Sequence, residues 1–212
     1  MNKVLIVSAG LCAISASAAA EETREYDLAP INAIKIATGV SGEVTVGSVQ
    51  SIRVETDKGD FEDLVVKVEN GRLTVRHDWD GNWLSRRKKP RYKLLATVTE
   101  LDEIDASSGA AITAEGIDSA DFSVDASSGA NVVVVGKCGD VSVDISSGAN
   151  VNARDLQCSN AAVDASSGAN AKVYAENEAD AEASSGALVT VYGEPTKVTA
   201  DKSSGGTVRV KK

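Results

Sequence analysis

The sequence is poor in the side chains from which most catalytic sites and large compact cores are built. Aromatic residues make up 4% of its 212 residues, and it holds one histidine, one methionine, three prolines and three cysteines. The single histidine, His77, would have to serve every general-base mechanism alone. So few large side chains fit one slim, elongated domain better than a compact globule of this length.

Basic residues are also in deficit. The chain has 22 Lys and Arg against 31 Asp and Glu, which gives a net charge of −9. If the first 20 residues are removed as a signal peptide, Lys3 is lost and the net charge becomes about −10. This balance disfavours a nucleic acid partner, because binding to phosphates needs a positive surface. Beyond the leader, no apolar stretch is long enough to span a membrane.

The first 20 residues have the pattern of a secretory signal peptide. Lys3 precedes an apolar run over 4–14, and small residues follow with A-x-A cleavage sites ending at Ala18 or Ala20. Cys12 follows Leu11, where a lipoprotein signal would have a small residue, so lipidation is the weaker interpretation. The sequence therefore predicts export to the periplasm, the cell surface or the medium.

One short phrase recurs six times after residue 100. It reads DASSGA, DASSGA, DISSGA, DASSGA, EASSGA and DKSSGG, and its glycines, Gly109, Gly129, Gly148, Gly168, Gly186 and Gly205, lie 18 to 20 residues apart. Such a period marks stacked repeats. Each copy is too short and too poor in large apolar residues to bury a face alone, so it must pack against the next copy.

Within each repeat, apolar residues alternate with polar ones, as a β-strand requires. The third and fifth residues after each glycine, such as Val132 and Val134, are expected to point inward, and a second strand ends just before each acidic residue. Twenty residues cannot hold two strands and a helical crossover. The sequence thus predicts an all-β fold, a single parallel β-solenoid over 21–212 with regular coils over 101–212.

The acidic residue, two serines and glycine of each phrase suit a tight turn, because glycine tolerates positive φ and the polar side chains can accept backbone N–H groups. They do not form a nucleophile motif, since GxSxG needs a strand-to-helix elbow. Before the repeats, strands are expected over 34–37, 40–46, 52–56, 64–68 and 73–77, with a turn at Asn70-Gly71. We interpret 21–100 as irregular coils that cap the solenoid.

Two cysteines remain after the leader. Cys138 and Cys158 each stand six residues before the acidic residue of their repeat, so stacking brings them together at the spacing of adjacent strands. An oxidising compartment favours their closure. We predict a Cys138–Cys158 disulfide, with a pair of stacked buried thiols as the alternative.

The acidic residues of the phrases would also stack, as a ladder of like charges. Turn N–H groups, serine hydroxyls and salt could relieve the repulsion without any cofactor, which is the interpretation we favour, whereas calcium is the alternative that an oxygen-rich ladder suggests. The ladder consists of Asp105, Asp125, Asp144, Asp164, Glu182 and Asp201.

One segment concentrates both tryptophans beside a basic run. Aromatic faces can stack on sugars, and adjacent Arg and Lys can hold phosphate or carboxylate groups, so this loop is the candidate binding site. The alternative is a solvated hairpin loop whose tryptophans cover the core. The candidate residues are Trp79, Trp83, Arg86, Arg87, Lys88, Lys89, Arg91 and Tyr92.

The stretches GVSGEVTVG and VENGRLTVR, the loop rich in Trp and Lys, and the repeated SSGA corners together resemble the bacterial head-GIN domain family of auto-transporter adhesins, over about 34–191. The resemblance implies a right-handed parallel β-helix similar to pectin-lyase-like folds, without their catalytic residues, and an adhesive role. No membrane barrel follows the solenoid within this sequence.

These observations favour a non-enzymatic exported protein that binds a surface polysaccharide or an envelope or host protein. One alternative is a polysaccharide lyase or hydrolase, since β-helices present long shallow grooves, although an isolated pair of acid and base is not evident. Another alternative is a structural spacer or homo-oligomerising module.

Overall fold

The structure is a computed structural model that describes residues 22–57, 60–78 and 90–212. Every regular element in these ranges is a β-strand. The described ranges contain no helix that could cross a membrane. The strands are β1 (Glu22–Tyr26), β2 (Ala33–Ile36), β3 (Ser41–Val46), β4 (Ser51–Thr56), β5 (Leu64–Glu69), β6 (Arg72–His77), β7 (Tyr92–Val98), β8 (Glu103–Ala106), β9 (Ala111–Ala126), β10 (Asn131–Ile145), β11 (Asn150–Ala165), β12 (Asn170–Tyr174), β13 (Glu178–Ala183), β14 (Leu188–Tyr192), β15 (Lys197–Lys202) and β16 (Thr207–Val210).

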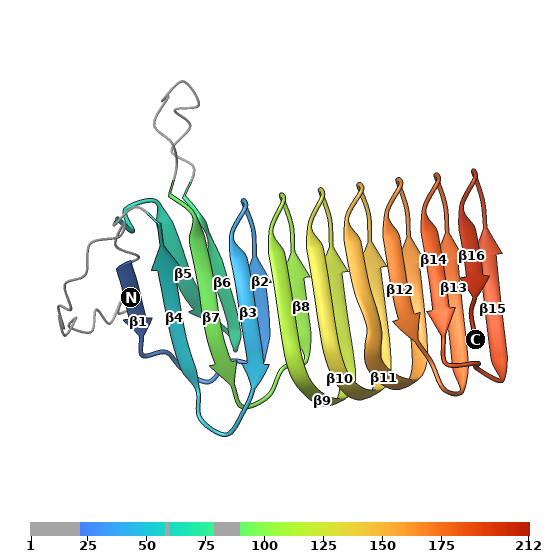
Figure 1. Ribbon diagram of the computed structural model, residues 1–212, viewed down its shortest axis with the longest axis horizontal. Coiled ribbons are helices and arrows are strands. Elements are labelled where there is room, and N and C mark those ends of the chain that lie inside the picture. The colour runs from blue at the N-terminus through green and yellow to red at the C-terminus, as the bar shows by residue number, and fades with distance from the viewer. Residues whose placement is uncertain (1–21, 58–59, 79–89) are drawn as a thin grey trace.

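The repeats form a parallel β-solenoid, which confirms the predicted fold class. Each of the long strands β9, β10 and β11 runs round most of one coil, and each pairs in parallel with the next. In the last two coils two shorter strands replace the long one, β12 with β13 and β14 with β15. Figure 1 shows the coils stacked along the long axis, with their turns in one row.

The interior is filled by small side chains at the predicted inward positions. Val132 and Val134 are 1% and 0% exposed, and the equivalent residues of the neighbouring coils are buried too. Ala and Val dominate these positions. The buried equivalents are Ile112, Ala114, Val151, Ala153, Ala171, Val173, Val189 and Val191.

The turns of the coils need two consecutive residues with positive φ, not the glycine alone that the sequence suggested. Ser108 and Gly109 have φ of 53° and 73°, and the N–H of Ala110 donates to the carbonyl of Ser107 at 3.2 Å, which makes a type I′ turn. The N–H of Gly109 also donates to the carbonyl of Ser128 on the next coil at 3.0 Å. The same bond recurs along the row of turns, so the backbone ladder continues through them.

The predicted pairing of the two cysteines is confirmed. Cys138 and Cys158 form a disulfide between adjacent coils, with their Cα atoms 4.5 Å apart. Asn131 and Asn150 also stack, and the side-chain amide of Asn150 donates to Oδ1 of Asn131 at 3.2 Å.

The N-terminal coils are irregular because their order in space differs from their order in the chain. The coil of β2 and β3 lies between β6 and β7 on one side and β8 and β9 on the other. Three antiparallel strands lie outside β6 and β7. β5 pairs with β6, β4 pairs with β7, and β1 pairs with β4. These strands cover the end of the solenoid that Figure 1 shows beside the N-terminus.

Candidate functional site

One outer surface of the solenoid is strongly acidic. It is formed by β8, the second halves of β9, β10 and β11, and by β13 and β15, and we call it the acidic face. Its carboxylates are exposed or half-buried, because alternate residues of these strands point away from the core. They are Asp102, Glu103, Asp105, Asp121, Asp125, Asp140, Asp144, Asp164, Glu178, Asp180, Glu182 and Asp201.

The ladder of acidic residues predicted from the repeats is one row of this face. Asp125 lies directly opposite Asp105 on one neighbour and Asp144 on the other, and the register continues through Asp164 to Glu182 and Asp201. The stacking of the ladder is therefore confirmed.

A second row, which was not predicted from the sequence, lies at the other end of the same strands. Asp121, Asp140, Asn160, Glu178 and Lys197 lie in register from β9 to β15. Each of them stands four residues before an acidic residue of the ladder, and residues four apart in a strand share a face. That spacing was the signal that could have revealed them.

A groove of about 440 Å³ follows the second row across the coils. Its floor includes Val141 and Ala161, which belong to the core, and its rim is polar and mostly acidic. Within the rim the Asn160 side-chain amide donates to Oδ1 of Asp140 at 2.6 Å. The other lining residues are Asp102, Asp121, Phe122, Ser123, Ser142, Ala162, Glu178 and Asp180.

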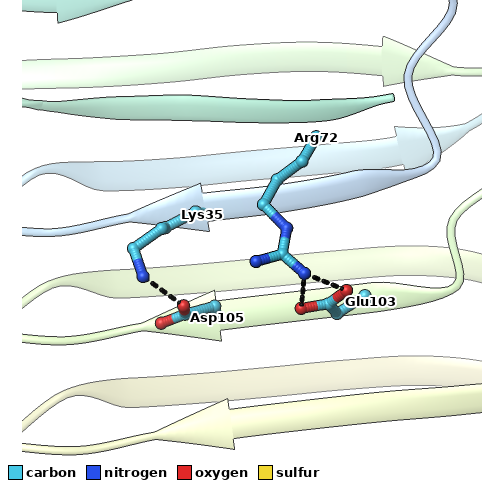
Figure 2. Close-up of polar contacts among 4 residues, drawn as sticks. All are labelled: Lys35, Arg72, Glu103 and Asp105. Carbon is cyan, nitrogen blue, oxygen red and sulfur yellow. Dashed lines mark hydrogen bonds and ion pairs between the residues drawn. The ribbon is translucent and has the colours of Figure 1, made fainter. Parts of the chain in front are cut away.

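Two cations close the acidic face toward the N-terminus, as Figure 2 shows. Nζ of Lys35 on β2 lies 2.5 Å from Oδ2 of Asp105 on β8, directly opposite in register. Nη2 of Arg72 on β6 lies 2.6 Å from each carboxylate oxygen of Glu103, and it reaches there across Ala33. The groove is lined mainly by residues of the coils beyond these pairs.

Asp125 occupies the second rung of the ladder, between Asp105 and Asp144. Its partial burial, and then the charges of Asp105 and Asp144, raise the pKa of its carboxyl above the ordinary value of 3.8, against a smaller opposing effect of Arg72. A raised pKa in the folded state means that the folded protein binds this proton more tightly than the unfolded chain does. The charged carboxylate of Asp125 is therefore a destabilising feature near neutral pH.

We expect Asp125→Asn to raise the stability near pH 7, by no more than about 1 kcal/mol because the site is largely exposed. The gain should be present above the raised pKa of Asp125 and should disappear as the pH falls below 3.8, where the wild-type carboxyl is protonated in both states. Urea unfolding of both proteins at several pH values measures this. A variant that is less stable at neutral pH would contradict it.

The described residues contain no group of three or more His, Cys, Asp or Glu side chains placed to hold one metal ion together. Carboxylates of adjacent coils stand side by side along the ladder rather than converging on a common centre. Calcium binding by the ladder stays the alternative that the sequence raised, and it would have to bridge neighbouring rungs.

The candidate loop lies mostly outside the described residues, which exclude Trp79, Trp83, Arg86, Arg87, Lys88 and Lys89. Arg91 is described and exposed, and its backbone N–H donates to Oδ1 of Asp57 at 2.8 Å.

Tyr92, in contrast, is 1% exposed and belongs to the core rather than to a binding surface. Its ring centroid lies 4.6 Å from that of His77 and 6.1 Å from that of Phe61, and its hydroxyl donates to the carbonyl of Asp60 at 3.3 Å. Burial, followed by the charges of Asp60 and Asp63, raises the pKa of Tyr92 to about 12. The sequence placed Tyr92 in the loop because it follows the basic run, but it is the first residue of β7.

One family model covers most of the chain. The model of the family described as "Putative auto-transporter adhesin, head GIN domain" matches residues 30–195. The chain belongs to the head GIN domain family. The matched segment of this head GIN domain extends from before β2 to beyond β14, so it contains the groove and all of the ladder except Asp201.

Solved structures share the fold of this head GIN domain at low sequence identity. A putative adhesin from Bacteroides fragilis NCTC 9343 is 16% identical, with a TM-score of 0.69, over 90% of this chain and 97% of that one. A putative adhesin from Parabacteroides merdae ATCC 43184 is 15% identical, with a TM-score of 0.54, over 91% and 96%. A putative lipid binding protein from Parabacteroides distasonis ATCC 8503 is 16% identical, with a TM-score of 0.52, over 91% and 97%. No curated protein matches the sequence.

Proposed function

We propose that this head GIN domain is a non-enzymatic binding module, exported to the cell envelope, and that its acidic face binds a surface polymer carrying cationic groups. The observation that carries the proposal is the groove, which extends along the axis from β9 to β13 and so suits an extended ligand. Membership of an adhesin family and the predicted leader support an exported role.

The chemistry of the rim selects the ligand class. Asp121, Asp140, Glu178 and Asp180 project acceptors from the rim, where Asp140 accepts from the Asn160 amide and Glu178 pairs with Lys197. Amines spaced along a polymer would find carboxylates on β9, β10 and β13. The repeat of one coil to the next, about 4.8 Å, makes the array quasi-periodic. Binding of this kind weakens as salt rises, because the carboxylates are exposed.

The repetition also supports binding over catalysis. Hydrolysis of a glycosidic bond needs one carboxyl group as acid and a second, in a different environment, as base or nucleophile. Along the groove Asp121, Asp140 and Glu178 occupy equivalent positions on β9, β10 and β13, with Asn160 at that position on β11. A single privileged pair does not stand out among the described residues, so we propose no reaction.

The test is binding of the exported protein to an array of envelope polysaccharides, some bearing free amines and some acidic. We expect the amine-bearing polymers to be retained, with Asp121→Asn/Asp140→Asn weakening their binding about fivefold to tenfold, at up to about 1 kcal/mol for each lost charge contact. The matched control is Glu115→Gln/Asp155→Asn, which removes two exposed charges from elsewhere on the solenoid and should bind like wild type.

The candidate loop is tested in the same experiment by changing Trp79, Trp83, Arg86 and Arg87 to alanine. Wild type and the groove variant would retain acidic polymers, and the folded loop variant would not, if the loop is the binding site. That result would overturn the assignment to the acidic face. Shortened products eluted from the array would overturn the non-enzymatic assignment.

A further inference from the structure

The last coil of the solenoid lacks a covering coil within the described residues. There β15 pairs with β13 alone and β16 with β14 alone, so one edge of each strand is unpaired. The side chains that would be buried in an inner coil are uncovered: Val198 and Val210 are 37% and 51% exposed, whereas Val191 one coil earlier is 0% exposed. Unpaired edges beside an apolar stripe are a template for another chain.

The opposite end has unpaired edges as well. Among the described strands, β1 pairs with β4 alone and β5 with β6 alone. The side chains of Leu64, Val66 and Val68 on β5 are only partly buried against the core. Figure 1 places β1 and β5 at one end of the long axis and β15 and β16 at the other.

The described residues of the two ends carry opposite charge. The C-terminal coil and the residues after it are mainly basic, although Lys197 pairs with Glu178, and Lys212 with Glu194 at 4.0 Å. The described residues of the N-terminal end are mainly acidic, although Arg24 lies over the Phe61 ring at 4.4 Å and Lys67 pairs with Glu69. The basic residues are Lys197, Lys202, Arg209, Lys211 and Lys212, and the acidic residues are Glu22, Glu25, Asp60, Glu62, Asp63 and Glu69.

We infer that copies of this chain associate head to tail, with the C-terminal edge of one copy against the N-terminal edge of the next. Stacking along the axis preserves strand direction, so β16 would run parallel to β1 of the next copy and β15 antiparallel to its β5. Both directions allow backbone hydrogen bonds. Tail-to-tail association is disfavoured, because it would place the basic ends against each other.

Such a contact is heterologous, so it continues from copy to copy and builds an open filament rather than a closed dimer. The inference goes beyond the proposed function, because it needs no ligand on the acidic face. It would align the grooves of successive copies into a longer binding surface, which raises the avidity for a polymer without any new contact to it.

The experiment is sedimentation velocity of the exported protein without ligand, from micromolar to millimolar concentration, at low and high salt. We expect the mean mass to rise with concentration, without a plateau at the dimer, and to fall as salt screens the ends. Reversing the charge of one end should leave monomers: Lys202→Glu/Lys211→Glu at the C-terminal end, or Glu22→Lys/Glu62→Lys at the N-terminal end. An equimolar mixture of the two variants should assemble again.

Matched controls are Lys172→Glu and Glu115→Lys, exposed changes of the same signs away from both ends, which should associate like wild type. A wild-type protein that stays monomeric throughout overturns the inference. If the N-terminal variant associates as strongly as wild type, the inference is also overturned. The association would then not use the N-terminal end, as in a tail-to-tail dimer. Failure of the polysaccharide array leaves this measurement unaffected.

Discussion

Replacing Gly136 with alanine should lower the free energy of unfolding by more than about 3 kcal/mol. This is the largest loss of stability that we expect from a substitution that removes no contact. Gly136 lies in β10 where the coil bends, with φ of 148°. A Cβ built there would stand 2.2 Å from the carbonyl oxygen of Ile117 and 2.6 Å from its nitrogen, on the adjacent strand. Backbone atoms on a paired strand cannot move away without breaking the ladder between β9 and β10.

The matched control is Gly109→Ala in a turn. Gly109 has φ of 73°, but a Cβ there would meet no heavy atom within 4 Å, so only the conformational cost of about 1 kcal/mol applies. Urea unfolding followed by circular dichroism compares the two variants with wild type. Equal losses would show that the bend adapts to a side chain, as it does at the equivalent Ile117 and Leu156, and would contradict the steric argument.

The regular coils could be predicted because every level of the sequence repeats with the same period. The parity of Val132 and Val134 relative to the turn glycine fixes which side chains point inward. Once consecutive repeats are stacked, the same offset places Cys138 opposite Cys158 and Asp125 opposite Asp144. Local pattern, register and disulfide are therefore consequences of one period.

The N-terminal half lacks that period, and its arrangement depends on pairing between distant segments. The strands themselves were largely anticipated, including the Asn70-Gly71 turn, whose residues have φ of 51° and 78°. The position of β2 between β6 and β8 was not anticipated. The strands have similar apolar patterns, so the sequence does not indicate which strand pairs with which. The burial of Tyr92 was missed for the same reason, since its core neighbours Phe61 and His77 are remote in the chain.

The candidate site shows the same division. The ladder was predicted from the acidic residue beside each turn, but the groove depends on a row that mixes Asp, Asn, Glu and Lys at one position. A position whose residue type differs from one repeat to the next is not recognised as a motif. Its common property is its place on the strand, four residues before the ladder, which gains meaning only after stacking.

Removing the disulfide should have the second large effect. Cys138→Ala/Cys158→Ala should lower the free energy of unfolding by about 3 kcal/mol, because the cross-link closes a loop of 20 residues and so restricts the unfolded chain. A smaller further loss comes from packing, since Cys158 is 2% exposed. The bond joins β10 to β11 in register, so its loss weakens the contact between two central coils.

Reduced wild type separates the two contributions, because it keeps both sulfur atoms while losing the cross-link. Urea unfolding with reductant should bring wild type most of the way to the double alanine variant, and reductant should leave that variant unchanged. The remaining difference measures the packing of the thiols. If reductant fails to shift the wild-type midpoint although free thiols are then detected, the parallel ladder alone holds the coils together, and the cross-link has no part in stabilising the solenoid.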